Sequence, residues 1–202
     1  MVVVKTGLES SNLSLGSKLA HVKGASYPDL EEITIPDFFA RTVSRYPNRE
    51  ACVFKKSGEC WTWLELARKI DQLSAGLLAL GIYKGERVGI LSPNRPEWVL
   101  TQFATARIGA ILVNINPAYQ RAELEYALVK VGVKALITAE SFKSSGYLKM
   151  LADLAPELSK SRPGRLAAAK FPLLKSVIQT GDAHVQGMFR FVDVMAKGGS
   201  GQ

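Results

Sequence analysis

Apolar positions follow two alternating patterns between residues 34 and 181. Within residues 62–80 they recur every three or four positions, the spacing that places side chains on one face of a helix. The positions of this stripe are Leu66, Ile70, Leu73 and Leu77. Residues 86–91 and 110–116, in contrast, form short, mostly apolar runs, which are typical of strands buried on both faces.

This alternation predicts both the elements and their order. We expect helices at 34–46, 62–80, 95–107, 121–131 and 141–158, the last broken at Pro156, and strands at 86–91, 110–116, 134–138 and 175–181. Thr62 and Glu65 predict a capping box, and Gly81 and Gly132 predict helix ends. The inward side chains are expected to include Phe38, Phe39, Val43, Tyr46, Leu124, Leu128 and Val131.

Residues 50–63 predict a β-hairpin. A two-residue turn at Ser57 and Gly58 would place Cys52 opposite Trp63 and keep the two thiols apart. Cys52 and Cys60 are therefore interpreted as small apolar fillers.

Strands that alternate with helices predict an α/β fold, a mostly parallel sheet with helices on both faces, preceded by a helix and a β-hairpin. Residues 1–33 show no sustained period and predict an extended N-terminal arm. Residues 34–195 would form the α/β subdomain, and the composition of 196–202 predicts a flexible tail.

The net charge of +8 and the pI near 9.5 raise the question of an anionic partner. The cations are spread out, with a mild concentration at 160–170, and no aromatic residues alternate with them. We therefore expect no nucleic-acid partner. No apolar run reaches the roughly 20 residues of a transmembrane segment, and the first residues do not resemble a secretory signal, so the expected location is cytoplasmic.

The sequence contains none of the common catalytic motifs. Phosphate loops, dinucleotide-binding glycine patterns, nucleophile elbows and zinc-protease helices are all missing. With two histidines and no metal-ligand spacing, it also predicts no metal site. We predict no catalytic residue in these 202 positions.

Two loops follow the predicted strands at their carboxyl ends, where open α/β sheets bind ligands. One is 92–98. The other carries Asn114, Asn116, Pro117, Tyr119, Gln120 and Arg121. The alternative interpretation of this second loop is a rigid turn that leads into the next helix.

In their order, these segments resemble the N-terminal part of AMP-forming acyl-CoA synthetases, members of the adenylate-forming superfamily. The segments that carry the resemblance include "WTWLELA" (61–67) and "ARIGAILVNINPAY" (106–119). The similarity extends from about residue 26 to residue 193 and is strongest for the fatty-acid branch. It implies ATP, CoA and Mg²⁺ as cofactors of the full-length enzyme, a fatty acid as its substrate, and a homodimer.

The resemblance also implies where the chemistry lies. The family's phosphate loop, its adenine- and metal-holding segment, its ribose motif and its catalytic lysine do not occur in this sequence. Tyr119, Gln120 and Arg121 would border the CoA path, with Arg121 near a CoA phosphate. The full-length family member would be an enzyme, whereas this segment alone would not. The alternative function is a non-catalytic α/β module that binds a nucleotide, CoA or another partner.

Overall fold

The computed structural model describes residues 24, 25, 27 and 29–199. The chain divides into two units, Met1–Glu32 and Ile33–Gln202. Most of the predicted arm lies outside the described residues and stays a prediction. The second unit holds every helix and strand described below.

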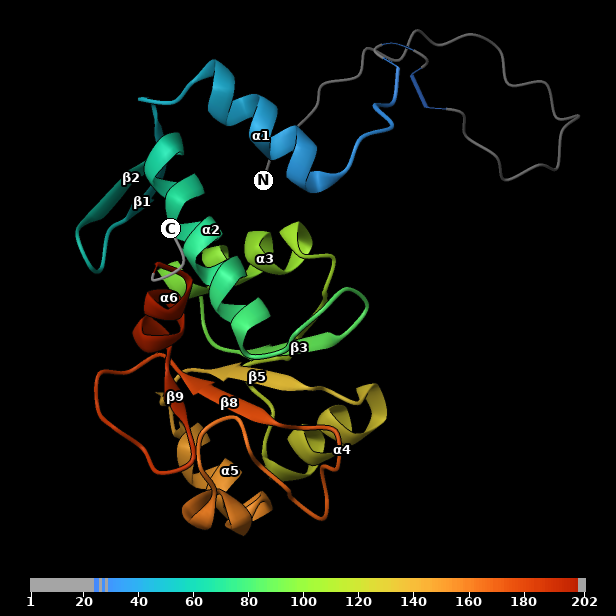
Figure 1. The fold of residues 1–202 in the computed structure, drawn as a ribbon, viewed down its shortest axis with the longest axis vertical. Helices are drawn as coiled ribbons and strands as arrows, with labels where there is room; N and C mark the ends of the chain where they lie inside the picture. Colours follow the sequence, from blue (N-terminus) through green and yellow to red (C-terminus); the bar gives the residue numbers. More distant parts are fainter. Residues whose placement is uncertain (1–23, 26, 28, 200–202) are drawn as a thin grey trace, which may run out of the picture. The chain divides into compact units, whose positions relative to one another are not determined.

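The elements follow one another in an α/β order (Figure 1). A helix and a hairpin come first: α1 (Ile35–Arg45), β1 (Glu50–Phe54) and β2 (Glu59–Thr62). The middle comprises α2 (Trp63–Ala79), β3 (Arg87–Leu91), α3 (Pro96–Arg107), β4 (Ile111–Asn114), α4 (Arg121–Val131) and β5 (Ala135–Thr138). The last part comprises β6 (Ser141–Phe142), β7 (Ser145–Gly146), α5 (Tyr147–Leu154), the 3-10 helix η1 (Pro156–Lys160), β8 (Ser176–Gln179), β9 (Phe189–Arg190) and α6 (Phe191–Gly199).

Five strands form one parallel sheet in the order β4-β3-β5-β8-β9. Helices α2, α3 and α6 cover one face, and α4 and α5 cover the other (Figure 1). The predicted fold class is therefore confirmed, including the helix and the hairpin that precede the sheet. Because all strands are parallel, their carboxyl ends meet at one edge and their amino ends at the opposite edge.

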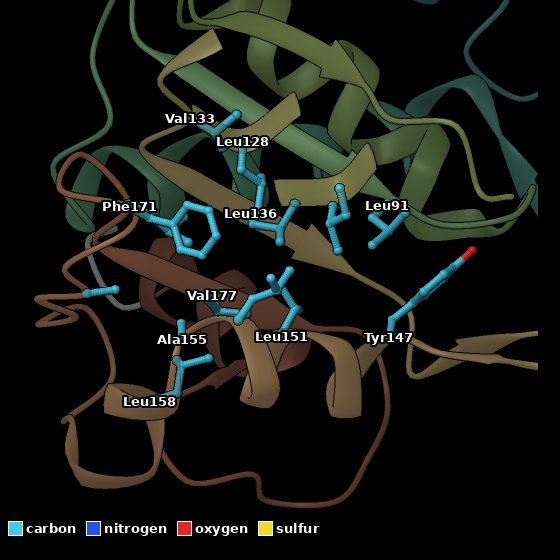
Figure 2. Packing of buried hydrophobic residues seen from close by; sticks show 14 of the residues in the cluster. Leu91, Leu128, Val133, Leu136, Tyr147, Leu151, Ala155, Leu158, Phe171 and Val177 are labelled. Atoms are coloured by element: carbon cyan, nitrogen blue, oxygen red, sulfur yellow. The ribbon is translucent and has the colours of Figure 1, made fainter. Parts of the chain in front are cut away.

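Each face of the sheet has its own hydrophobic core. Leu136 and Val177 of the sheet pack with Leu128 of α4 and Leu151 of α5, as Figure 2 shows. On the other face, the predicted stripe of α2 is fully buried against alternate residues of the same strands. This two-sided burial explains the continuous apolar character of β3, β5 and β8.

The predicted helix caps are confirmed. Thr62 Oγ1 accepts from Glu65 N at 3.2 Å, and Glu65 Oε2 accepts from Thr62 N at 2.8 Å. Gly132 ends α4 with a φ of 65°, in the left-handed region that favours glycine. Local sequence thus determines the start of α2 and the end of α4.

The predicted flexible tail is wrong for residues 196–199, which continue α6. Helices α2 and α6 approach so closely that a Cβ on Gly198 would lie 2.1 Å from Gln72 O, and one on Gly76 would lie 2.0 Å from Val194 O. The glycines interpreted as signs of flexibility therefore permit a close helix contact. Residues 200–202 lie outside the described part.

The predicted hairpin register is also wrong. A four-residue loop, 55–58, joins the strands, and Cys52 faces Trp61 while Val53 faces Cys60. An irregularity between Glu50 and Cys52 shifts the pairing. Both cysteines are free thiols.

Residues 141–158 form four elements, β6, β7, α5 and the start of η1, and not a single helix with a break at Pro156. The break at Pro156 is confirmed. Lys143, with a φ of 52°, turns the chain between β6 and β7, and α5 begins only at Tyr147. Pro156 then starts η1, because proline cannot continue the hydrogen-bond pattern of α5.

Three predictions of burial are wrong. Strand β4 is the edge strand of the sheet, with Ile111 half exposed at 51%, and is not buried on both faces. Phe38 of α1 and Val131 of α4 are likewise exposed. No helix among the described residues is long and apolar enough to span a membrane.

Candidate functional site

An open groove of about 490 Å³ lies at the carboxyl edge of the sheet. The loop after β3 supplies one wall and the loop after β4 supplies the other, as expected for neighbouring parallel strands. The lining residues are Ser92, Pro93, Asn94, Trp98, Asn114, Ile115, Asn116, Pro117 and Phe142. The structure thus brings together the two loops that the sequence singled out.

The lining of this groove is neutral. It contains three asparagines, a serine, two prolines and two aromatic rings, but no acidic or basic side chain. Such a surface offers hydrogen bonds and apolar contact without charge. It suits an uncharged chain with amide groups better than a phosphate.

Hydrogen bonds hold the second wall of the groove. Tyr147, fully buried at the start of α5, donates its hydroxyl to Pro117 O. Burial raises the pKa of Tyr147, which keeps the phenol protonated as a donor. Asn116 Oδ1 accepts from Ala118 N at 2.9 Å, a turn that asparagine side chains favour. The wall is therefore preformed.

The three predicted CoA-path residues lie beside the groove and do not line it. Tyr119 packs against the core under α4 and α5. Gln120 is the N-cap residue of α4, and its Nε2 donates to Ser145 Oγ at 2.9 Å. The exposed Arg121 has Asp153 as its ion-pair partner, with Nη1 and Oδ2 4.0 Å apart. Their role on a CoA path stays a prediction.

The sequence did not indicate that Phe142 lines this groove, because a helix was expected there. The available signal was its place four residues after β5, at the same carboxyl edge as the other two loops.

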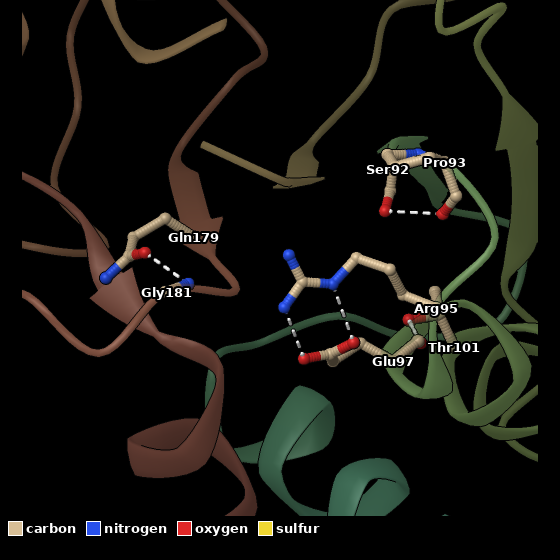
Figure 3. Close-up of polar contacts among 7 residues, drawn as sticks. All are labelled: Ser92, Pro93, Arg95, Glu97, Thr101, Gln179 and Gly181. Atoms are coloured by element: carbon tan, nitrogen blue, oxygen red, sulfur yellow. Dashed lines mark hydrogen bonds and ion pairs between the residues drawn. The ribbon is translucent and has the colours of Figure 1, made fainter. Parts of the chain in front are cut away.

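The charge of Arg95, which follows Asn94 of the groove, is neutralised by an ion pair within the chain. Arg95 forms a bidentate ion pair with Glu97, with nitrogen–oxygen distances of 3.2 and 3.3 Å, as Figure 3 shows.

At the end of β8, the buried Gln179 side chain accepts a hydrogen bond from Gly181 N and donates one to Ala183 O, both at 2.6 Å. Thr180 Oγ1 is the buried side-chain polar atom without a partner among the described residues.

This arrangement does not fit ATP or Mg²⁺. A triphosphate needs several cations or aligned N–H donors, and Mg²⁺ needs carboxylate or carbonyl oxygens. Nothing in the groove lining supplies charge of either sign, and the described residues contain no cluster of three metal-binding side chains. The groove lining therefore offers no group for phosphoryl chemistry.

Comparison with known proteins identifies the family to which the sequence is similar. Residues 39–187 match the AMP-binding enzyme family. The chain is 42% identical over 181 residues to the mitochondrial medium-chain acyl-CoA ligase ACSF2 of Danio rerio, covering 90% of this chain and 30% of that protein. It is 36% identical over 171 residues to the putative acyl-CoA synthetase YngI of Bacillus subtilis (strain 168), covering 84% and 31%.

Solved structures agree on the fold. The anthranilate CoA ligase AuaEII, in complex with anthranoyl-AMP, superposes with a TM-score of 0.67 at 23% identity, over 81% of this chain and 28% of that one. The inhibitor-bound N-terminal domain of FACL13 from Mycobacterium tuberculosis gives a TM-score of 0.64 at 20% identity, over 81% and 35%.

The chain spans about 30% of the length of the curated relatives. Within that span, the family match and the similarity to curated ligases cover the helix, the hairpin and the parallel sheet together. The chain therefore belongs to the AMP-binding enzyme family and corresponds to the N-terminal portion of an acyl-CoA ligase.

Proposed function

We propose that this chain is the scaffold portion of an ATP-dependent fatty-acyl-CoA ligase and forms one wall of its acyl and CoA path. The complete enzyme would join a fatty acid to ATP, forming acyl-AMP and releasing pyrophosphate. CoA thiolate would then attack the acyl carbon, forming the thioester and releasing AMP. A medium-chain fatty acid is the proposed substrate, because the most similar curated relatives carry that name.

The observation that carries this proposal is the neutral groove at the carboxyl edge of a sheet shared with acyl-CoA ligases. Its asparagines and aromatic rings suit the amide-bearing arm of CoA and an acyl chain. It offers nothing for the phosphates of ATP, which need concentrated positive charge. The remaining part of such an enzyme would have to supply the phosphate loop, the metal-holding acid and the lysine. The homodimer and the cytoplasmic location also remain predictions.

A segment exchange tests the proposal. Residues 24–199 of this chain would replace the matched segment of the Danio rerio ligase. Because this segment is expected to be structurally equivalent to the one it replaces, the chimera should retain ATP–pyrophosphate exchange with a medium-chain fatty acid and Mg²⁺. It should also form the CoA thioester. A chimera that carries the matched segment of the human ligase, 39% identical to this chain, serves as the control.

The isolated chain is expected to show no exchange under the same conditions, because loss of a charge-stabilising group alone costs about 10²–10³ in rate. A folded chimera that is inactive, beside an active human-segment control, would contradict the proposal. Exchange by the isolated chain at the rate of the complete ligase would contradict it as well.

A further inference from the structure

The amino ends of β3, β5 and β8 carry a row of three cations. Lys134 N donates to Arg87 O at 2.9 Å, and Lys175 N donates to Lys134 O at 2.8 Å, so these residues lie at the same level on adjacent strands. The next positions, Val88, Ala135 and Ser176, are register partners. Since neighbouring strands lie about 4.8 Å apart, three positive residues stand side by side.

Like charges on adjacent strands destabilise a sheet unless something compensates them. Lys134 is compensated, because its Nζ contacts Glu86 Oε1 and donates to Gly81 O at 2.7 Å. Arg87 is compensated in part: its Nε donates to Val131 O at 3.0 Å. Among the described residues, neither the terminal nitrogens of Arg87 nor the ammonium of Lys175 forms a hydrogen bond or an ion pair. The row therefore keeps uncompensated positive charge.

The chain around this row forms two adjoining depressions of about 350 and 580 Å³, which share Lys134 and Lys175. The second depression adds Arg165. Together the described lining holds four cations, Arg87, Lys134, Arg165 and Lys175, and one carboxylate, Glu86. Leu173 and Tyr83, 53% and 59% exposed, lie in the same lining and add apolar surface.

We propose that this amino-edge cluster, Arg87, Lys134, Arg165 and Lys175, is a binding site for a phosphate group. The guanidinium of Arg87 is held by its Nε, which leaves the terminal nitrogens to donate to two phosphate oxygens. Lys175 and Arg165 add positive charge, and neither forms an ion pair with a carboxylate among the described residues.

The cluster lies at the opposite end of the strands from the carboxyl-edge groove, so it does not depend on the proposed function. The phosphate could belong to a soluble phosphate compound or to a phospholipid headgroup, for which Leu173 and Tyr83 would supply apolar contact.

The test uses the intact 202-residue chain. Calorimetric titration with pyrophosphate at constant ionic strength probes soluble phosphate. Co-sedimentation with phosphatidylcholine vesicles, with and without phosphatidic acid, probes the headgroup. The variant is Lys175→Gln, which removes an exposed charge that forms no ion pair with the described residues. Lys56→Gln, in the exposed hairpin loop, is the matched control for net charge. Circular dichroism checks that each variant folds.

Lys175→Gln is expected to weaken binding about tenfold, a charge-assisted contact of about 1.4 kcal/mol, while Lys56→Gln should change it less than about twofold. Arg165→Gln should weaken binding as well. Binding to pyrophosphate identifies a soluble ligand, and binding only to phosphatidic acid vesicles identifies a headgroup. Equal effects of Lys175→Gln and Lys56→Gln, or no binding to either probe, would overturn the proposal.

Discussion

The two edges of the same parallel sheet differ in charge. At the carboxyl edge, the groove is neutral and the nearby Arg95 is paired with Glu97. At the amino edge, the described lining holds four cations and a single carboxylate. Open α/β sheets bind ligands at their carboxyl edge, yet here the charge that a phosphate needs is concentrated at the other one. Position in the fold therefore indicates where a ligand can fit, whereas the flanking side chains decide its chemistry.

Removal of Glu86, the one carboxylate in the described lining of the amino edge, should have the largest effect on stability. Glu86→Gln leaves the half-buried Lys134 without its ion-pair partner and is expected to cost about 2 kcal/mol of unfolding free energy at neutral pH. Because the edge becomes more positive, pyrophosphate should bind more tightly. Urea unfolding and calorimetry measure the two effects. A variant that is less stable but binds pyrophosphate no more tightly would contradict the proposal that positive charge at the amino edge determines phosphate binding.

The same variant should change the pH dependence of stability. Burial acts to raise the pKa of Glu86, but hydrogen bonds from Lys134 and from Tyr83 N outweigh it and hold the pKa below its usual value. A lowered folded-state pKa stabilises the protein above the unfolded value of about 4.3, and this contribution is lost as the pH falls through the folded pKa. The stability gap between wild type and Glu86→Gln should therefore shrink below about pH 4. Glu59→Gln, in the hairpin, is the control.

Gly132 provides a test of whether the position of the Arg87 guanidinium matters for binding at the amino edge. Gly132→Ala and Gly85→Ala both place alanine at a positive φ, 65° and 83°, which should cost each variant about 1–2 kcal/mol. Only at Gly132 would the new Cβ meet Arg87 Nη2, at 3.0 Å, and Leu173 Cδ1, at 2.9 Å; at Gly85 nothing lies within 4 Å.

The two glycine variants should therefore lose similar stability, because the side chains near Gly132 can move. Only Gly132→Ala should weaken pyrophosphate binding, since it displaces the Arg87 guanidinium. Thermal unfolding and calorimetry give the two readouts. Equal binding by both variants would mean that the position of Arg87 does not matter for the site.

At the carboxyl edge, Tyr147→Phe should cost about 1 kcal/mol, because it removes the donor to Pro117 O. The freed loop is expected to exchange its amide hydrogens faster, first at Tyr119 N, which donates to Asn116 O. Pyrophosphate binding at the other edge should not change. Tyr126→Phe, on an exposed tyrosine of α4, is the control. Unchanged exchange in the loop would show that Tyr147 does not hold the groove wall.

The sequence predicted those parts of the fold that local rules decide. The capping box at Thr62 and Glu65, the buried stripe of α2 and the end of α4 at Gly132 depend on neighbouring residues, and all were confirmed. The exposure of β4 could not be predicted in this way, since it depends on where the strand lies in the sheet. The close contact that keeps Gly198 helical depends on α2, which is far away in the sequence.

The two edges were predictable to different degrees. Asn116 and Pro117 were found because they follow a strand, but Phe142 was hidden in an expected helix. The amino-edge row had a signal in the sequence: Arg87, Lys134 and Lys175 each stand where a predicted strand begins. That they form a row depends on the strand order β3-β5-β8, which apolar periodicity does not specify.

The smallest effect on stability is expected for Arg121→Ala beside the groove. Arg121 and its partner Asp153 are exposed, at 60% and 45% of their side chains, so loss of this pair should cost less than about 0.5 kcal/mol. Lys149→Ala removes another cation from the same Asp153, at 3.9 Å, and is the matched control. In the Danio rerio chimera, Arg121→Ala should raise KM for CoA and leave ATP–pyrophosphate exchange unchanged, because its cation would contact a CoA phosphate and not ATP. If both variants leave KM for CoA unchanged, Arg121 does not belong to the CoA path.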